Sequence, residues 1–233
     1  MTNLSEFTFL SSDGKTQLHG MLWEPEGVAV RAVLQICHGV AEHIARYDGF
    51  ARALNEQGIV VAGHDHLGHG KSLPEGGTPV YFGEGNTWNT VVDDIYVLHQ
   101  RLKQRYPDVP LCIMGHSMGS FLLRTYLYTY PDAVDKAVIS GTGWEDPTKV
   151  RLGKLVCRLE QARVGETSTS KLVTKLMFGS YNKPFGAVTS PNAWICSDEA
   201  VVAAYDADPL CGFDATVGLA RDLLTGVEMN EQP

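Results

Sequence analysis

A short apolar run, a Gly-x-Ser-x-Gly motif and a second apolar run follow one another in the middle of the chain. The first run, Val109–Met114, has the length of a buried strand, and the second, Phe121–Tyr130, has its apolar residues at helical spacing. We therefore predict a strand that turns sharply into a helix at Ser117. Gly115 and Gly119 suit that turn because they allow a strained backbone and a close approach of strand and helix.

A serine at such a turn is held at the mouth of a sheet, which is typical of a nucleophile. The helix that follows aims backbone N–H groups at any anion formed beside the hydroxyl. The alternative is a glycine-rich turn with an incidental serine, because the bare motif is a weak signal. The strand and the helix on either side favour the functional interpretation.

Apolar runs alternate with amphipathic segments through the first part of the chain. Runs at Ala32–Ile36, Ile59–Ala62 and Lys136–Ser140 predict further buried strands. Helices are predicted over Tyr47–Gln57 and from Thr87 to about Arg105. Two antiparallel strands are expected before them. This alternation predicts an α/β fold with a mostly parallel sheet and helices on both faces.

Three polar loops leave the carboxyl ends of these strands. They are His38–His43, Gly63–Ser72 and Gly115–Ser120. Ligands of open parallel sheets bind at these ends, so we expect the three loops to converge on one pocket.

The pattern changes after Gly141, because helical stretches continue without intervening strands. We predict an α/β core, incomplete, over residues 1–143 and a helical cap or lid over residues 144–233, folded across the strand ends. The helices expected in this part are Leu152–Ala162, Lys171–Phe178, Asp198–Tyr205 and Phe213–Leu224.

Composition excludes several classes of function and location. The formal charge of −8 argues against nucleic acid as a partner. No apolar run has transmembrane length, and the first residues do not have the pattern of a signal peptide. The five cysteines form no CxxC pair, which suggests reduced thiols and a cytoplasmic protein.

The spacing His64-x-His66-x-x-His69 is similar to a dimetal signature of metallo-β-lactamase folds, and imidazoles so spaced can hold zinc. The acidic partner of that signature would fall at Gly68, and no histidine follows His116 to complete a second ligand set. We therefore predict neither a metal site nor a cofactor.

Four motifs in order carry a family resemblance. They are His38-Gly39, Glu42-His43, the segment Asp65–Ser72 and the segment Gly115–Gly119. Together they resemble the α/β-hydrolase superfamily and, within it, the monoacylglycerol lipase/lysophospholipase group, also labelled serine aminopeptidase S33. The resemblance implies hydrolysis of carboxylic esters, with a small monoacylglycerol- or lysophospholipid-like lipid or ester as substrate. It leaves open a transient contact of the cap with a membrane surface.

The resemblance also implies roles for single residues. Ser117 would attack the ester carbonyl and form an acyl-enzyme. The backbone N–H groups of Val40 and Met118 would form the oxyanion hole. The residues expected to support these loops are His38, Gly39, Asp65, Gly115 and Gly119.

One departure from the family's pattern is serious. The catalytic triad of this fold runs serine, acid, histidine, but the last histidine here is His116. We therefore expect no triad acid or base in this chain, and we interpret it as a truncated copy that lacks the last two strands and is inactive or weakly active alone. The alternatives are a non-catalytic lipid- or partner-binding protein and a peptidase of the same fold. An uncovered sheet edge at Lys136–Ser140 would favour oligomers.

Overall fold

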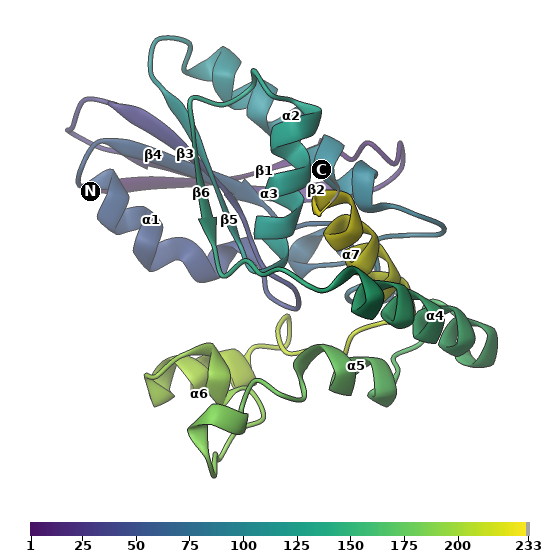
Figure 1. Cartoon of the computed structure of the whole chain (residues 1–233). Helices are drawn as coiled ribbons and strands as arrows, with labels where there is room; N and C mark the ends of the chain where they lie inside the picture. The colour runs from purple at the N-terminus through teal and green to yellow at the C-terminus, as the bar shows by residue number, and fades with distance from the viewer. Residues whose placement is uncertain (232–233) are drawn as a thin grey trace.

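A six-stranded mixed sheet organises the computed structural model, which describes residues 1–231 (Figure 1). The strand order is β1-β2-β4-β3-β5-β6; β1 and β2 are antiparallel to their neighbours, and the other four strands are parallel to one another. This confirms the predicted fold class. The strands are β1 (Thr2–Leu10), β2 (Gln17–Pro25), β3 (Ala32–Cys37), β4 (Ile59–His64), β5 (Leu111–His116) and β6 (Lys136–Ser140).

Helices lie on both faces of the sheet and beyond the ends of its strands (Figure 1). Most begin and end within a few residues of the predicted bounds, although α4 begins earlier and α7 ends later. The α-helices are α1 (Asp48–Asn55), α2 (Trp88–Arg105), α3 (Met118–Thr129), α4 (Pro147–Val164), α5 (Lys171–Phe178), α6 (Glu199–Ala207) and α7 (Val217–Asn230). Single 3-10 turns are η1 (Ile44–Tyr47), η2 (Gly70–Ser72), η3 (Lys183–Phe185) and η4 (Ala193–Ile195).

The central strands are apolar on both sides because the sheet has a core on each face. In β3, Val33 and Cys37 face the larger core, which includes residues of α2 and α3. Ile36 points to the opposite face and packs with Ala51 of α1. Alternate residues of a strand point to opposite faces, so a nearly continuous apolar run indicates a strand covered on both sides.

The chain reverses its direction of winding at β3. It passes from β3 through α1 to β4 on one side, and then through α2 to β5 on the other side. Cys37 at the end of β3 is paired with Gly115 near the end of β5. Such a switch point leaves a crevice beyond the carboxyl ends of the two strands, where ligands of open α/β sheets bind.

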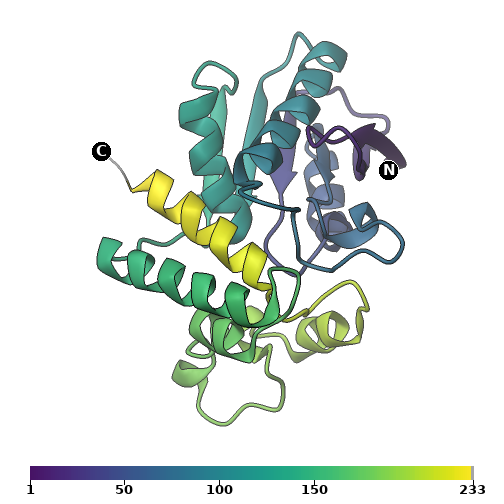
Figure 2. The same cartoon turned by 90° about the vertical axis from the view of Figure 1, so that its right-hand side faces the viewer.

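The helices after β6 occupy two positions. Helices α5 and α6 lie beyond the carboxyl ends of the parallel strands, whereas α7 lies beside α3 (Figure 1). Figure 2 shows α7 between α4 and the layer formed by α2 and α3, and contacts of α7 with all three helices agree. The predicted division at residue 143 stays a prediction, and Gln232 and Pro233 of the predicted cap lie outside the described residues.

Strand β6 forms an edge of the sheet. Within residues 1–231 it pairs with β5 alone, through a register that joins Met114 to Val138. Val138 and Ile139 are both exposed. The strand therefore presents apolar side chains together with a row of backbone groups on its free side.

Candidate active site

Ser117 occupies the turn between β5 and α3, where strand, turn and helix follow one another as predicted. Its backbone has φ 52° and ψ −120°, a left-handed conformation that L residues rarely adopt. A Cβ atom at Gly115 would lie 2.3 Å from the carbonyl oxygen of Gly119, and one at Gly119 would lie 2.1 Å from that of Cys37. Both glycines are therefore required for strand and helix to come this close.

The loop after β3 lies directly beside the serine. A Cβ atom at Gly39 would be 3.2 Å from Cβ of Ser117. The N–H of Gly39 donates to Oε1 of Glu42 at 2.6 Å, and Glu42 also accepts from the hydroxyl of Tyr47 and pairs with Arg46. This buried carboxylate holds the turn in place.

Two backbone N–H groups near Ser117 have no intramolecular acceptor within residues 1–231, one at the start of α3 and one on the loop after β3. Met118 is the first residue of α3, so its N–H has no acceptor within the helix. Within residues 1–231, neither this group nor the N–H of Val40 donates to another backbone carbonyl or side chain. Their arrangement supports the predicted oxyanion hole, which stays a prediction.

Two residues much later in the chain, Tyr205 and Gly212, also hold the loop after β3 in position. Ala41 adopts φ 53°, and its carbonyl oxygen accepts from the hydroxyl of Tyr205 at 2.8 Å and from the N–H of Gly212 at 3.0 Å. This contact could not be predicted from the sequence, because no periodic pattern links Tyr205 to a loop 164 positions away.

His38 is completely buried, and both of its ring nitrogens are occupied. Nε2 accepts from the N–H of His66 at 3.0 Å, so Nδ1 carries the proton and donates to the carbonyl oxygen of Gly39 at 2.7 Å. Burial lowers the pKa of His38, although the carboxylates of Asp65 and Glu42 oppose this effect. The ring is placed to orient two loops and has no nitrogen free to take a proton from Ser117.

Asp65 joins three segments around the site. Its carboxylate accepts from Nδ1 of His19 and from the N–H groups of Ile44 and Lys71, at 2.8–2.9 Å. Burial acts to raise the pKa of Asp65, but these hydrogen bonds prevail and lower it to about 2. These contacts of an ionised Asp65 agree with the predicted role in supporting the loops, which stays a prediction.

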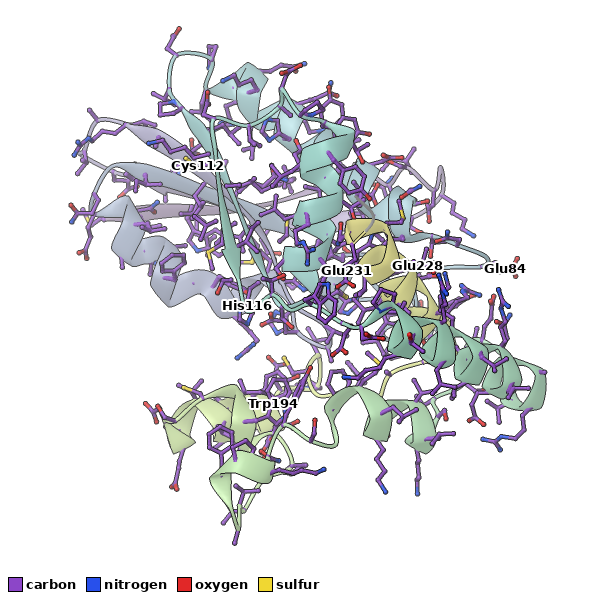
Figure 3. All side chains as sticks on the ribbon, viewed as in Figure 1. Glu84, Cys112, His116, Trp194, Glu228 and Glu231 are labelled. Carbon is purple, nitrogen blue, oxygen red and sulfur yellow. The ribbon has the colours of Figure 1, made fainter. Side chains whose placement is uncertain are left out.

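No side chain within residues 1–231 hydrogen bonds to Oγ of Ser117. His116 is the nearest histidine in sequence, and its Nδ1 lies 3.5 Å from Oγ of Ser140, at the limit of a hydrogen bond. In Figure 3, His116 is at the carboxyl end of β5, and Trp194 is on the segment between α5 and α6. The absence of a triad acid and base stays a prediction.

His64, His66 and His69 are buried among aromatic rings. His64 and His66 lie edge to face, with ring centroids 5.0 Å apart, and His69 packs near Phe82. Among residues 1–231, the one group of three side chains close enough to share a metal ion is a different one, His43, Asp208 and Cys211.

A cavity of about 460 Å³ opens beside the loop after β3. Its walls are this loop, helix α5, Tyr205 of α6 and the segments on either side of α6. The lining combines apolar and aromatic side chains with a few polar ones, which suits an amphipathic ligand. The lining residues are Val40, Ala41, Lys171, Thr174, Lys175, Phe178, Gly179, Asn182, Pro191, Asn192, Trp194, Tyr205, Gly212, Phe213 and Asp214.

Comparison with known families agrees with this geometry. The family model described as serine aminopeptidase S33 matches residues 28–232. The chain belongs to this family. Membership confirms the resemblance to α/β-hydrolases of the monoacylglycerol lipase group that the four sequence motifs indicate.

Curated relatives of this S33 protein include two lipases. Monoglyceride lipase of Mus musculus is 30% identical over 226 residues, which cover 96% of this chain and 66% of the relative. Monoacylglycerol lipase of Mycolicibacterium smegmatis is 27% identical over 226 residues, which cover 94% and 70%. The chain thus spans about two thirds of the length of these relatives.

A solved structure supports the same assignment. A thermostable carboxyl esterase from Bacillus coagulans, in complex with glycerol, superposes with a TM-score of 0.86 at 28% identity and covers 98% of this chain and 74% of that chain. Among the described residues of the S33 chain, no helix is both long and apolar enough to cross a membrane.

Proposed function

We propose that this chain carries the nucleophile and the oxyanion hole of a carboxylic ester hydrolase that acts on monoacylglycerol- or lysophospholipid-like substrates. Ser117 is the nucleophile, and the N–H groups of Val40 and Met118 receive the oxyanion. The observation that carries the proposal is the left-handed backbone of Ser117, directly beside the loop after β3, together with the N–H groups of Met118 and Val40, which have no intramolecular acceptor within residues 1–231.

The substrate class rests on two observations. The curated relatives are named for monoglyceride hydrolysis, and the esterase structure holds glycerol. The cavity beside Val40 has a volume of about 460 Å³, which is enough for part of an acyl chain. Phe178, Trp194 and Phe213 supply apolar walls that suit such a chain. If an ester is bound with its carbonyl group near Ser117, its acyl chain can contact these apolar walls.

The reaction would proceed through an acyl-enzyme. Oγ of Ser117 attacks the carbonyl carbon, the hydroxyl proton leaves to a base, and the alcohol departs before water releases the acid. This chain has no histidine after Ser117, and both nitrogens of His38 are occupied. We therefore propose a residual rate on the order of 10³–10⁴-fold above the uncatalysed reaction and on the order of 10⁶-fold below that of an intact triad, supported by the oxyanion hole and binding alone.

The test measures p-nitrophenyl ester hydrolysis and labelling by a fluorophosphonate for three proteins. Ser117→Ala should remove the residual hydrolysis and the slow labelling of the unsubstituted chain. Ser5→Ala, an exposed serine on β1, should change neither. Hydrolysis that persists in Ser117→Ala would refute the assigned nucleophile, and rapid labelling of the unsubstituted chain would show that another residue acts as base.

A second candidate function is binding of a lipid or ester without turnover. Two observations favour it: Oγ of Ser117 has no hydrogen-bond partner within residues 1–231, and a cavity lies beside the loop after β3. Saturable binding of a monoacylglycerol ether, which cannot be hydrolysed, together with hydrolysis equal to that of Ser117→Ala, would favour this candidate.

We propose two further properties on structural grounds. Helices α4 and α5 expose leucines that could contact a membrane surface briefly during substrate uptake. All five cysteines are free thiols, which supports a reducing compartment such as the cytoplasm.

A further inference from the structure

Three side chains of different chemistry come together where the loop after β3, which carries Val40, contacts the segment after α6. His43 precedes η1, while Asp208 and Cys211 follow α6. One donor atom from each lies within 4.8 Å of the others, and Nε2 of His43 is 2.8 Å from Oδ2 of Asp208. His43 and Cys211 are buried, and Asp208 is partly exposed. None of the three lines the cavity described above.

Local hydrogen bonds hold the two donors that follow α6 in position. Oδ1 of Asp208 accepts from the N–H of Leu210 at 2.9 Å, which leaves Oδ2 directed at His43. The N–H of Cys211 donates to the carbonyl oxygen of Asp208 at 3.1 Å, so a tight turn brings the thiol back toward the carboxylate. Such fixed outer contacts reduce the cost of ordering metal ligands.

The set of donors selects among metal ions. A thiolate and an imidazole are poor ligands for Mg²⁺ and Ca²⁺, which prefer oxygen. Zinc accepts sulfur, nitrogen and carboxylate oxygen together, commonly with a water in the fourth position. The positive charge that acts on Cys211, that of Arg46, is paired with Glu42.

We propose that His43, Asp208 and Cys211 form a Zn²⁺ site that joins the loop after β3 to the segment after α6. On binding, the thiol of Cys211 loses its proton to the solvent as the sulfur–zinc bond forms. The proton that Nε2 of His43 shares with Oδ2 of Asp208 moves to Nδ1 by a change of tautomer, so that Nε2 and Oδ2 can each bond to zinc. The oxidation state of the ion does not change, and no further reactant is needed.

The ion would stabilise the site described above without contacting substrate. Its ligands lie on the same two segments that the carbonyl oxygen of Ala41 joins through Tyr205 and Gly212. Zinc would replace the hydrogen bond between His43 and Asp208 with metal bonds to both segments and restrict the loop that holds Val40.

The experiment uses the full chain after treatment with a chelator. Zinc titration against a chromophoric chelator should give one ion per chain and, at a hundredfold excess over the dissociation constant, a rise in Tm of about 5–10 °C. Cobalt substitution should produce the near-ultraviolet absorption of a thiolate–cobalt bond. Cys211→Ser should lose this band and weaken zinc binding by about tenfold or more.

Cys196→Ser is the matched control, because it removes a thiol outside the cluster and should keep the band and the affinity. Alkylation of the unsubstituted chain, mapped by mass spectrometry, is a readout that needs no variant: zinc should slow modification of Cys211 and leave Cys196 unaffected. Absence of the cobalt band, or an equal band in Cys211→Ser, would overturn the proposal.

Discussion

Four imidazoles, those of His38, His64, His66 and His69, are buried together near Asp65. The ring centroid of His38 lies 4.2 Å from that of His66 and 5.4 Å from that of His69. Five ring nitrogens of this group have no hydrogen-bond partner within residues 1–231. Burial lowers the pKa of all four residues, to about 3 for His64 and His69. The folded chain therefore keeps these rings neutral at pH values where the unfolded chain binds protons.

We expect this cluster to make the protein acid-sensitive. A lowered histidine pKa stabilises the folded state fully above about pH 6.5, and each such group loses about 1.4 kcal/mol per pH unit below that value. Burial raises the pKa of Asp94 to about 6 and also raises that of Asp222. Burial acts to lower the pKa of His19, but hydrogen bonds to Asp65 and Glu6 prevail and raise it. These three groups act in the opposite direction, but the four lowered histidines outnumber them. Urea unfolding followed from pH 7 to pH 5 should show a steep fall in the free energy of unfolding.

Replacement of one ring tests the origin of that slope. His64→Phe should reduce the slope by about one proton, because it removes one titrating group from the folded core. His116→Gln, a partly exposed residue outside the cluster, should keep the full slope. An unchanged slope in His64→Phe would contradict the assignment.

At the scale of elements, helix α7 is attached to the layer of α2 and α3 by a close helix contact. A Cβ atom at Gly226 would lie 2.1 Å from the ring of Trp88, which is fully buried. Nearby, the hydroxyl of Thr87 donates to Asp222 at 2.7 Å. The absence of a side chain at Gly226 thus sets the distance between α7 and α2.

Gly226→Ala should lower the free energy of unfolding by about 1–3 kcal/mol, because the ring of Trp88 has no room to move. This loss should occur although alanine favours a helix by up to about 1 kcal/mol over glycine. Gly49→Ala in α1 is the matched control, since its Cβ would meet open space, and it should be neutral or stabilising. Chemical denaturation of both variants measures the difference; equal stabilities would contradict the contact.

The exposed leucines of α4 lie at positions i, i+3 and i+7. Leu152, Leu155 and Leu159 are 50–63% exposed, and basic residues of α4 lie among them. Leu155→Glu with Leu159→Glu should reduce sedimentation with vesicles of phosphatidylcholine and phosphatidylserine by about tenfold or more, since each buried leucine contributes about 1.5–3 kcal/mol. Leu10→Glu, a similarly exposed leucine at the end of β1, should bind as the unsubstituted chain does.

The elements that sequence predicted best are those whose cause is local. The β5–Ser117–α3 succession follows from two apolar runs and two glycines that lie next to one another in the chain. The contacts of Tyr205 with Ala41 and of Asp208 with His43 were not predictable, because they join positions 164 and 165 residues apart without any periodic pattern. Sequence thus indicates the position of the proposed nucleophile, whereas tertiary structure is needed to show what holds the loop beside it.

For the molecule as a whole, the free edge of β6 is the feature that bears on assembly. The strand offers unpaired backbone groups on the side away from β5 within residues 1–231, and Ile139 is 43% exposed. Such an edge can add a strand from a second molecule. We therefore expect concentration-dependent self-association, as the sequence suggested for this edge.

A charge on the edge should oppose that association. Ile139→Lys should increase the monomer fraction measured by size-exclusion chromatography with light scattering, because a lysine on an edge strand hinders pairing. Val28→Lys, at a residue that is 44% exposed and outside the sheet, should behave as the unsubstituted chain does. If the unsubstituted chain is a monomer at all accessible concentrations, the expectation that the edge of β6 drives self-association is wrong.

The position of α7 also has a consequence for synthesis on the ribosome. Thr87 on the core side and Asp222 on α7 are 135 residues apart. Translation adds about 5–20 residues per second, so roughly 7–27 s pass between the synthesis of the segment around Trp88 and the synthesis of α7, which covers it. During that interval the nascent chain presents a large aromatic side chain that the finished fold conceals. We therefore expect the α2–α3 surface to need protection by a chaperone while the chain is being made.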